Sequence, residues 1–217
     1  MEPSKDFSPA TYPAIRIKYG RFLDPVFEVY VKTRPRWEKW TRPDDKEVKR
    51  LVEIDSSAWK EKEEIIIKTM CETMSLNFLQ NIIDVYVVSG NNRSFSDPIT
   101  IRTYVQPEKF VDELAHEFTH RLMADNVQCL NKTRMGVILK NVFPKEPGDV
   151  RSHIQTYATL KRIFVDTLGD SNWTERNLKI MAGSPRPEYK KAWKIVEEIG
   201  HTEVIKMIRE EREKNLN

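Results

Sequence analysis

This chain of 217 residues lacks several features that would place a protein in a narrow class. It has only two cysteines, Cys71 and Cys129, and they form no close pair, so we expect buried, reduced thiols rather than a redox motif or a disulfide. No apolar run approaches the roughly 18 residues of a membrane span. Residues 1–19 have no apolar segment typical of a signal peptide. These absences predict a cytoplasmic protein with no membrane partner.

Net charge is also low, because 36 basic and 33 acidic residues leave a formal charge of only +3. So small an excess gives no reason to expect nucleic acid as a partner. Hydrophobic residues make up 39% and charged residues 32%. This composition is typical of a folded protein that is somewhat more polar than average, and it is unlike that of a disordered chain. The length suits one domain with a full core, with or without a small helical extension.

The hydrophobic pattern predicts an α+β fold. Strands are expected where apolar and polar residues alternate or β-branched residues are dense, at 14–19, 26–32, 82–88 and 99–105. Helices are expected at 46–78 (a break near 55–57 is left open), 107–125, 136–142, 150–168, 173–181, 188–199 and 201–215. We expect 1–170 to form one domain and 171–217 to pack on it as a C-terminal helical extension.

Two of the chain's 4 histidines lie in the motif His116-Glu117-Phe118-Thr119-His120, inside a predicted helix. Residues four apart in an α-helix lie one above the other on the same face. Both imidazoles can therefore bind one Zn²⁺ ion. Glu117 lies close beside that face, where it can hold a zinc-bound water and take its proton as a general base.

The nine residues 114–122, Leu-Ala-His-Glu-Phe-Thr-His-Arg-Leu, resemble the active-site helix of the zincin metallopeptidases. The order of elements is also similar, with strands 82–88 and 98–105 before the motif helix, and the resemblance covers roughly residues 14–168. It implies a mostly parallel sheet with one antiparallel edge strand that lines the substrate cleft. It also implies one catalytic zinc and a peptide or protein substrate that Glu117 helps to hydrolyse.

A catalytic zinc usually has three protein ligands, and two zincin subfamilies supply the third in ways that this chain does not match. The metzincin extension needs a glycine three positions after His120 and a histidine three positions later, where this chain has Met123 and Asn126. The gluzincin pattern needs a glutamate on the next long helix, but 150–168 contains none.

That helix does contain His153 in its first turn, and we predict His153 to be the third ligand. Glu146, Asp149 and Asp166 remain alternatives. Asp149 is more simply explained as the N-cap of the helix. Asp166 lies on nearly the opposite helix face from His153, so these two residues cannot serve the same ion.

Tyr157 follows His153 by one helical turn and is a candidate catalytic residue. If His153 binds the metal, the hydroxyl of Tyr157 is expected to point towards the metal and to stabilise the oxyanion of a tetrahedral intermediate. The alternative is a core tyrosine, because Tyr157, Leu160, Phe164 and Leu168 form an apolar stripe.

The predicted strand 99–105 comes immediately before the motif helix, so its end is expected near the metal. If this strand is the edge of the sheet, its free backbone groups can bind an extended peptide as an added strand. The alternative is an internal strand that is already paired on both sides.

A non-catalytic class of function also stays open: a zinc-binding or interaction module that retains the scaffold. Residues 34–42 mix arginine and lysine with Trp37 and Trp40, a combination that can stack on single-stranded nucleic acid. A surface loop anchored by its tryptophans is the simpler interpretation. The presence of Glu117 favours an enzyme, because a purely structural metal site does not need this carboxylate.

Overall fold

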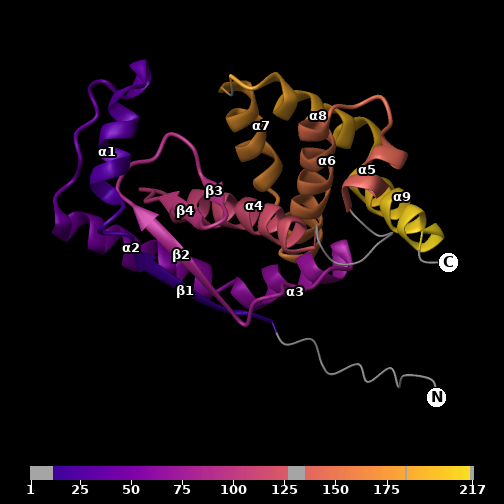
Figure 1. The fold of residues 1–217 in the computed structure, drawn as a ribbon, viewed down its shortest axis with the longest axis horizontal. Helices are drawn as coiled ribbons and strands as arrows, with labels where there is room; N and C mark the ends of the chain where they lie inside the picture. The colour runs from indigo at the N-terminus through magenta and orange to yellow at the C-terminus, as the bar shows by residue number, and fades with distance from the viewer. Residues whose placement is uncertain (1–11, 127–134, 184, 216–217) are drawn as a thin grey trace.

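The computed structural model describes residues 12–126, 135–183 and 185–215, so Cys129 lies outside the described residues. The molecule is α+β, as predicted, with one small sheet and many helices. Figure 1 shows α1 and α2 at one end of the molecule and α5, α8 and α9 at the other, with α3 and α4 between them.

The sheet is mixed and has the strand order β1-β2-β4-β3. β1 (Ala14–Tyr19), β2 (Ile82–Val88) and β4 (Ile99–Arg102) run parallel, while the short edge strand β3 (Phe95–Ser96) is antiparallel to β4. A mostly parallel sheet with one antiparallel edge strand is what the family resemblance implied.

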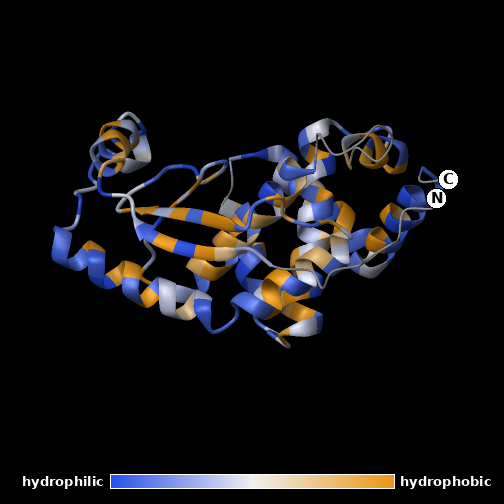
Figure 2. Cartoon of the chain, turned by 60° about the horizontal axis from the view of Figure 1, so that its bottom comes forward, coloured by the Kyte–Doolittle hydropathy of each residue, from blue (hydrophilic) through white to orange (hydrophobic). Residues whose placement is uncertain are grey.

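The register of the sheet separates a buried face from an exposed one. Ile15 lies opposite Ile83, and both side chains are buried. Successive strand residues point to opposite faces, so the next pair, Arg16 and Asp84, faces the other way and forms an ion pair at 2.7 Å. Figure 2 shows hydrophobic residues running along the strands.

The predicted strand 26–32 is wrong, because the structure has a helix there, α1 (Asp24–Lys32). Pro25 occupies the first turn, where its missing N–H costs nothing. The buried carboxylate of Asp24 accepts hydrogen bonds from the main-chain N–H and the hydroxyl of Ser89, which ties the start of α1 to the end of β2. The alternation of apolar residues in 26–32 wrongly indicated a strand with a buried face, because Val29 points outward and is 69% exposed.

The predicted strand 99–105 is shorter than expected, and of the two positions left open for it, the internal one is correct. β4 ends at Arg102 and pairs with β2 on one side and β3 on the other. The chain then turns towards α4, and Val105 is 86% exposed. The main-chain N–H of Tyr104 donates to the buried carboxylate of Asp55 at 3.0 Å, which fixes this turn.

The predicted helix 46–78 consists of two helices, α2 (Asp45–Lys60) and α3 (Glu63–Met74), and the break lies at 61–62 rather than at 55–57. Asp44 caps α2 by accepting a hydrogen bond from the Glu47 N–H. A 3-10 turn, η1 (Pro35–Trp37), precedes α2. The later elements are α4 (Pro107–Asp125), α5 (Met135–Val142), α6 (Gly148–Lys161), the π-helical turn η2 (Arg162–Thr167), α7 (Trp173–Gly183), α8 (Pro187–Ile199) and α9 (His201–Lys214).

One hydrophobic core connects the sheet to the C-terminal helices. Phe118 of α4 is fully buried and stacks on Trp59 of α2, with ring centroids 5.3 Å apart. Trp193 of α8 and Ile208 of α9 belong to the same buried cluster. The helices of 171–217 therefore pack on the rest of the chain, while the domain boundary at residue 170 stays a prediction.

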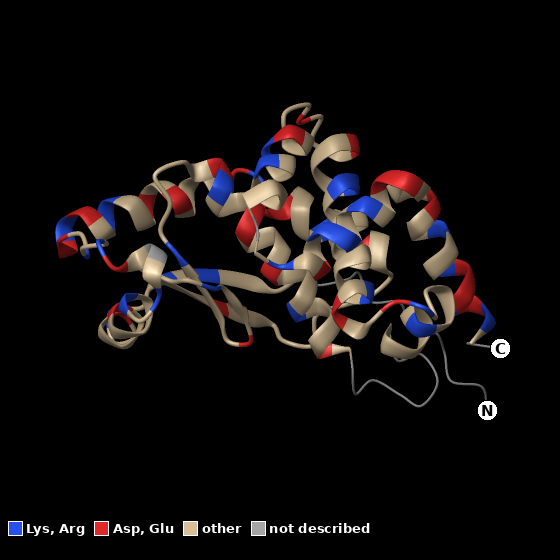
Figure 3. Cartoon of the chain, turned by 90° about the horizontal axis from the view of Figure 1, so that it is seen from above, with Lys and Arg blue, Asp and Glu red and all other residues tan. Residues whose placement is uncertain are grey.

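No helix in the described ranges is both long and apolar enough to cross a bilayer. Figure 3 shows acidic and basic residues interspersed along the outer helices.

Candidate metal centre

Three histidines from two helices meet in one place. His116 and His120 project from α4, and His153 projects from α6. One side-chain nitrogen of each lies within 4.8 Å of the others, and the Nε2 atoms of His116 and His120 are 3.0 Å apart. A hydrogen bond of 3.1 Å between the hydroxyls of Thr119 and Thr156 joins the two helices beside them. The structure thus brings together the three histidines that the sequence singled out.

His153 is held in the orientation and tautomer that a metal ligand requires. Its Nδ1 lies 2.6 Å from the main-chain carbonyl of Asp149; a carbonyl only accepts, so Nδ1 carries the proton. Nε2 is then an acceptor, and it is buried with no hydrogen-bond partner. An unpartnered buried lone pair beside two other imidazoles fits a metal ion.

The environment keeps the imidazoles neutral, which is the state that binds metal. Burial, together with the neighbouring His153, lowers the pKa of His120 to about 3. Burial likewise lowers the pKa of His116 well below its ordinary value. The cluster therefore offers three lone pairs and no positive charge of its own at neutral pH.

The alternative third ligands are occupied elsewhere. Glu146 forms an ion pair with Lys191 at 2.5 Å, and Asp166 is bound to His201 at 2.9 Å. None of the three alternatives belongs to the group of converging ligand atoms among the described residues.

Asp149 contributes to the centre through its main chain rather than through its carboxylate. The expectation that it caps α6 is wrong: α6 begins at Gly148, the N-cap position is Pro147, and no side chain caps the helix. Asp149 lies in the first turn of α6, where its main-chain carbonyl accepts a hydrogen bond from the Nδ1–H of His153.

Glu117 lies beside His116 on α4 and is only 8% exposed. Burial raises the pKa of its carboxyl to about 8; the negative charge of Glu113 adds to the rise, and Arg93 opposes it. A carboxylate in such a setting binds a proton strongly, which suits a general base. A divalent cation nearby would favour its ionised form.

Tyr157 lies near the histidines but its hydroxyl is engaged. The ring centroid is 6.0 Å from that of His116, and the side chain is buried against Trp193. The hydroxyl donates to the sulfur of Met181 at 3.5 Å. Its role towards an oxyanion stays a prediction.

Tyr189 of α8 is a site residue that sequence reasoning missed. Its ring centroid lies 4.1 Å from that of His153. Burial raises the pKa of its hydroxyl; Arg186 opposes the rise and Glu117 adds to it. The amphipathic pattern of α8 predicts only packing, because no local signal links this helix to a motif so far away in sequence.

The histidines and Glu117 line a cleft of about 1240 Å³. Its other walls come from the end of α1, the β2–β3 loop, β3, β4, α7 and α8. Figure 1 shows α1 and α7 on opposite sides above α4. The edge strand β3 lines this cleft, as the family resemblance implied, and such a cleft has room for a polymer as well as a small molecule.

Comparison of the chain with models of known protein families, with curated proteins and with solved structures finds no match. Only the geometry and chemistry of the site therefore bear on its function.

Proposed function

We propose that the protein is a zinc-dependent hydrolase, a metallopeptidase that cleaves peptide bonds. One observation carries the proposal: three neutral histidines converge beside the buried Glu117 on the wall of an open cleft. Metal-binding helices with a glutamate next to the first histidine serve hydrolysis, because the carboxylate has no task in a purely structural site.

His116, His120 and His153 would hold the ion. Three imidazoles suit Zn²⁺ and leave a fourth position open to the cleft, as catalytic zinc sites require. When bound, zinc lowers the pKa of a coordinated water towards neutrality and polarises a carbonyl group.

Glu117 would accept a proton from the attacking water and later pass it to the leaving amine. Its burial limits access of bulk water to that proton. The outer edge of β3 would receive the substrate backbone, since β3 and not β4 is the edge of the sheet on this side. Amide bonds in an extended peptide suit this arrangement.

The test compares the unmodified protein with Glu117→Gln. We expect about one zinc per chain in both, and hydrolysis of an unfolded protein substrate only in the unmodified form, with a loss on the order of 100-fold or more in the variant. Metal analysis by mass spectrometry and a fluorogenic casein assay measure the two properties.

Two outcomes contradict the proposal. Absence of zinc after incubation with the metal removes the site, and equal turnover in Glu117→Gln removes the general base. Zinc without any turnover on peptides would instead support the non-catalytic alternative.

A further inference from the structure

Three arginines on one side of the cleft have aromatic partners in place of acidic ones. They come from the segment after α1, from the β2–β3 loop and from the end of β4, and all line the cleft. We call Arg34, Arg93 and Arg102 the arginine wall. Their guanidinium carbons lie over Tyr30 at 5.1 Å, over Phe95 at 5.6 Å, and over Tyr104 and Trp37 at 4.5 and 5.2 Å, respectively.

Nearby carboxylates neutralise other arginines and not the wall. Asp97 pairs with Arg121, and Asp112 pairs with Arg176 at 3.0 Å. Within the described residues, no arginine of the wall has a carboxylate at ion-pair distance. The three guanidinium groups therefore have no carboxylate partner in the part of the chain that the structure describes.

A guanidinium that rests on a ring face keeps N–H groups at its edge for other partners; that of Arg34 also donates to the Tyr30 hydroxyl at 3.3 Å. That edge matches the two oxygens of a carboxylate. The wall also lines the same cleft as His116, His120 and His153. A group bound by Arg93 would thus lie in the cleft that holds the proposed metal centre.

We propose that the arginine wall binds acidic side chains of the polypeptide substrate, so that the enzyme prefers chains rich in aspartate or glutamate near the cleaved bond. This inference rests on the proposed peptidase function. It assigns substrate preference to residues outside the metal centre.

Nucleic acid is the other polyanion with the right charge, but the aromatic rings of the wall are poorly placed to stack on bases. Trp37 is 8% exposed, with Arg102 over one ring, and Trp40 packs edge-on against it at 5.6 Å. Arg93 likewise covers Phe95. The guanidinium edges, and not the ring faces, are the groups that remain available.

The test measures binding without turnover, in zinc-loaded Glu117→Gln protein. The probes are two fluorescein-labelled peptides of about ten residues, one alternating glutamate with alanine and one with glutamine in place of glutamate. We expect the glutamate peptide to bind about tenfold more tightly by fluorescence anisotropy, and Arg93→Gln or Arg102→Gln to weaken it about fivefold each. Lys68→Gln, which removes one exposed charge outside the cleft, is the matched control and should have no effect.

Arg93 lies on the surface, so its replacement spares the fold; circular dichroism and zinc content verify this for each variant. Arg93→Glu should go further and favour a lysine-containing peptide. Equal affinity for the two probes overturns the inference, as does an equal loss in Lys68→Gln. Tighter binding of a single-stranded oligonucleotide of the same charge also overturns it.

Binding and turnover separate the two proposals. If the unmodified protein cleaves no peptide but binds the acidic probe selectively, the arginine wall stands and the peptidase proposal fails. If it cleaves both peptides with equal KM, the peptidase proposal stands and the preference fails.

Discussion

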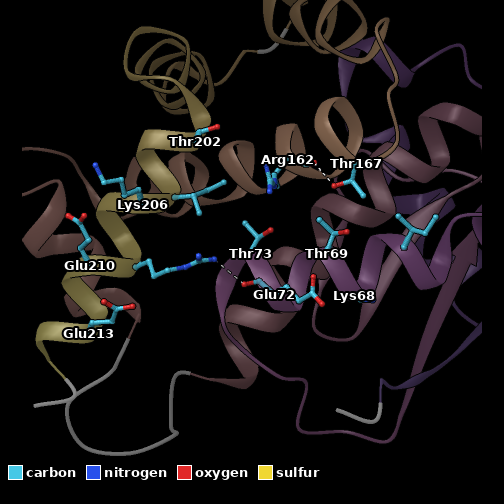
Figure 4. Close-up of a pocket in the computed structure, with 13 residues that line it drawn as sticks. Lys68, Thr69, Glu72, Thr73, Arg162, Thr167, Thr202, Lys206, Glu210 and Glu213 are labelled. Atoms are coloured by element: carbon cyan, nitrogen blue, oxygen red, sulfur yellow. Dashed lines mark hydrogen bonds between the residues drawn. The ribbon is translucent and has the colours of Figure 1, made fainter. Parts of the chain in front are cut away.

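The histidine cleft and a groove between α3 and α9 are both open hollows, of about 1240 and 820 Å³. Figure 4 shows the groove, with Lys68 from α3, Arg162 from η2, and Lys206 and Glu210 from α9. These four side chains are exposed. A large hollow lined by charged side chains is therefore present in both regions and does not by itself mark a functional site.

They differ in how their polar groups are satisfied. In the groove, the hydroxyl of Thr167 donates to the carbonyl of Arg162 at 3.0 Å (Figure 4), and the Arg162 side chain pairs with Asp166. In the cleft, the Nε2 of His153 is buried without a partner, and burial raises the pKa of Glu117. Buried polar groups whose interactions are incomplete within the fold mark a site more clearly than a hollow does.

The strongest way to break this comparison is to remove a histidine. We expect His153→Ala to weaken zinc binding on the order of 100-fold or more, because a three-ligand site becomes a two-ligand site. Asp166→Ala should change it little, since Asp166 is bound to His201. Competition with a chromogenic chelator measures both affinities; a larger loss in Asp166→Ala would reverse the assignment.

The groove supplies the second control for this experiment. Arg209→Ala removes an exposed cation of α9 and should leave zinc affinity unchanged. A comparable loss there would show that the two hollows are energetically linked.

A smaller effect is expected from Asp55, whose buried carboxyl has its pKa raised to about 7 by desolvation. The folded state then holds this proton more tightly than the unfolded state, so its stabilising contribution is present below about pH 4 and is lost as pH rises towards 7. The free energy of unfolding of Asp55→Asn, compared with that of the unmodified protein, should therefore rise by about 1–3 kcal/mol as the pH goes from 5 to 8.

Urea denaturation at the two pH values measures this difference. Glu210→Gln, an exposed acid of the groove, should leave the pH profile as it was. Parallel profiles for Asp55→Asn and the unmodified protein would mean that Asp55 does not titrate in this range.

The smallest effect distinguishes the two tyrosines of the cleft. Tyr189 lines the same cleft as Glu117, whereas the hydroxyl of Tyr157 is bound to Met181. We expect Tyr189→Phe to lower kcat about tenfold with zinc retained, a smaller effect than the loss of a main oxyanion-hole donor. Tyr157→Phe should lower it less; the reverse order in a steady-state assay would restore the role predicted for Tyr157 from sequence.

Local patterns predicted the elements of the site well. The helix predicted at 107–125 matches α4. Its signals are local: Pro107 lies in the first turn, and the buried residues Val111, Leu114, Phe118 and Leu122 form an apolar stripe along one side of the helix. His153 was identified by elimination among few candidates, and its position beside His116 depends on how α4 packs against α6.

Long-range contacts explain what the sequence could not predict. The alternation in 26–32 fits a strand, but Asp24 anchors a helix to Ser89, which lies far along the chain. The sheet position of β4 depends on a two-residue strand, Phe95–Ser96, that is too short to leave a pattern. Tyr189 reaches His153 only through the packing of α8 on α6.

The contact of α8 with the metal centre has a consequence for the order of folding. Tyr189 lies against His153 and Trp193 lies against Tyr157, so the wall of the cleft comes from chain that is synthesised well after the motif helix. A nascent chain that ends before α8 lacks this cover over the three histidines. The complete wall of the site therefore forms only after α8 has been synthesised, not when the motif helix emerges.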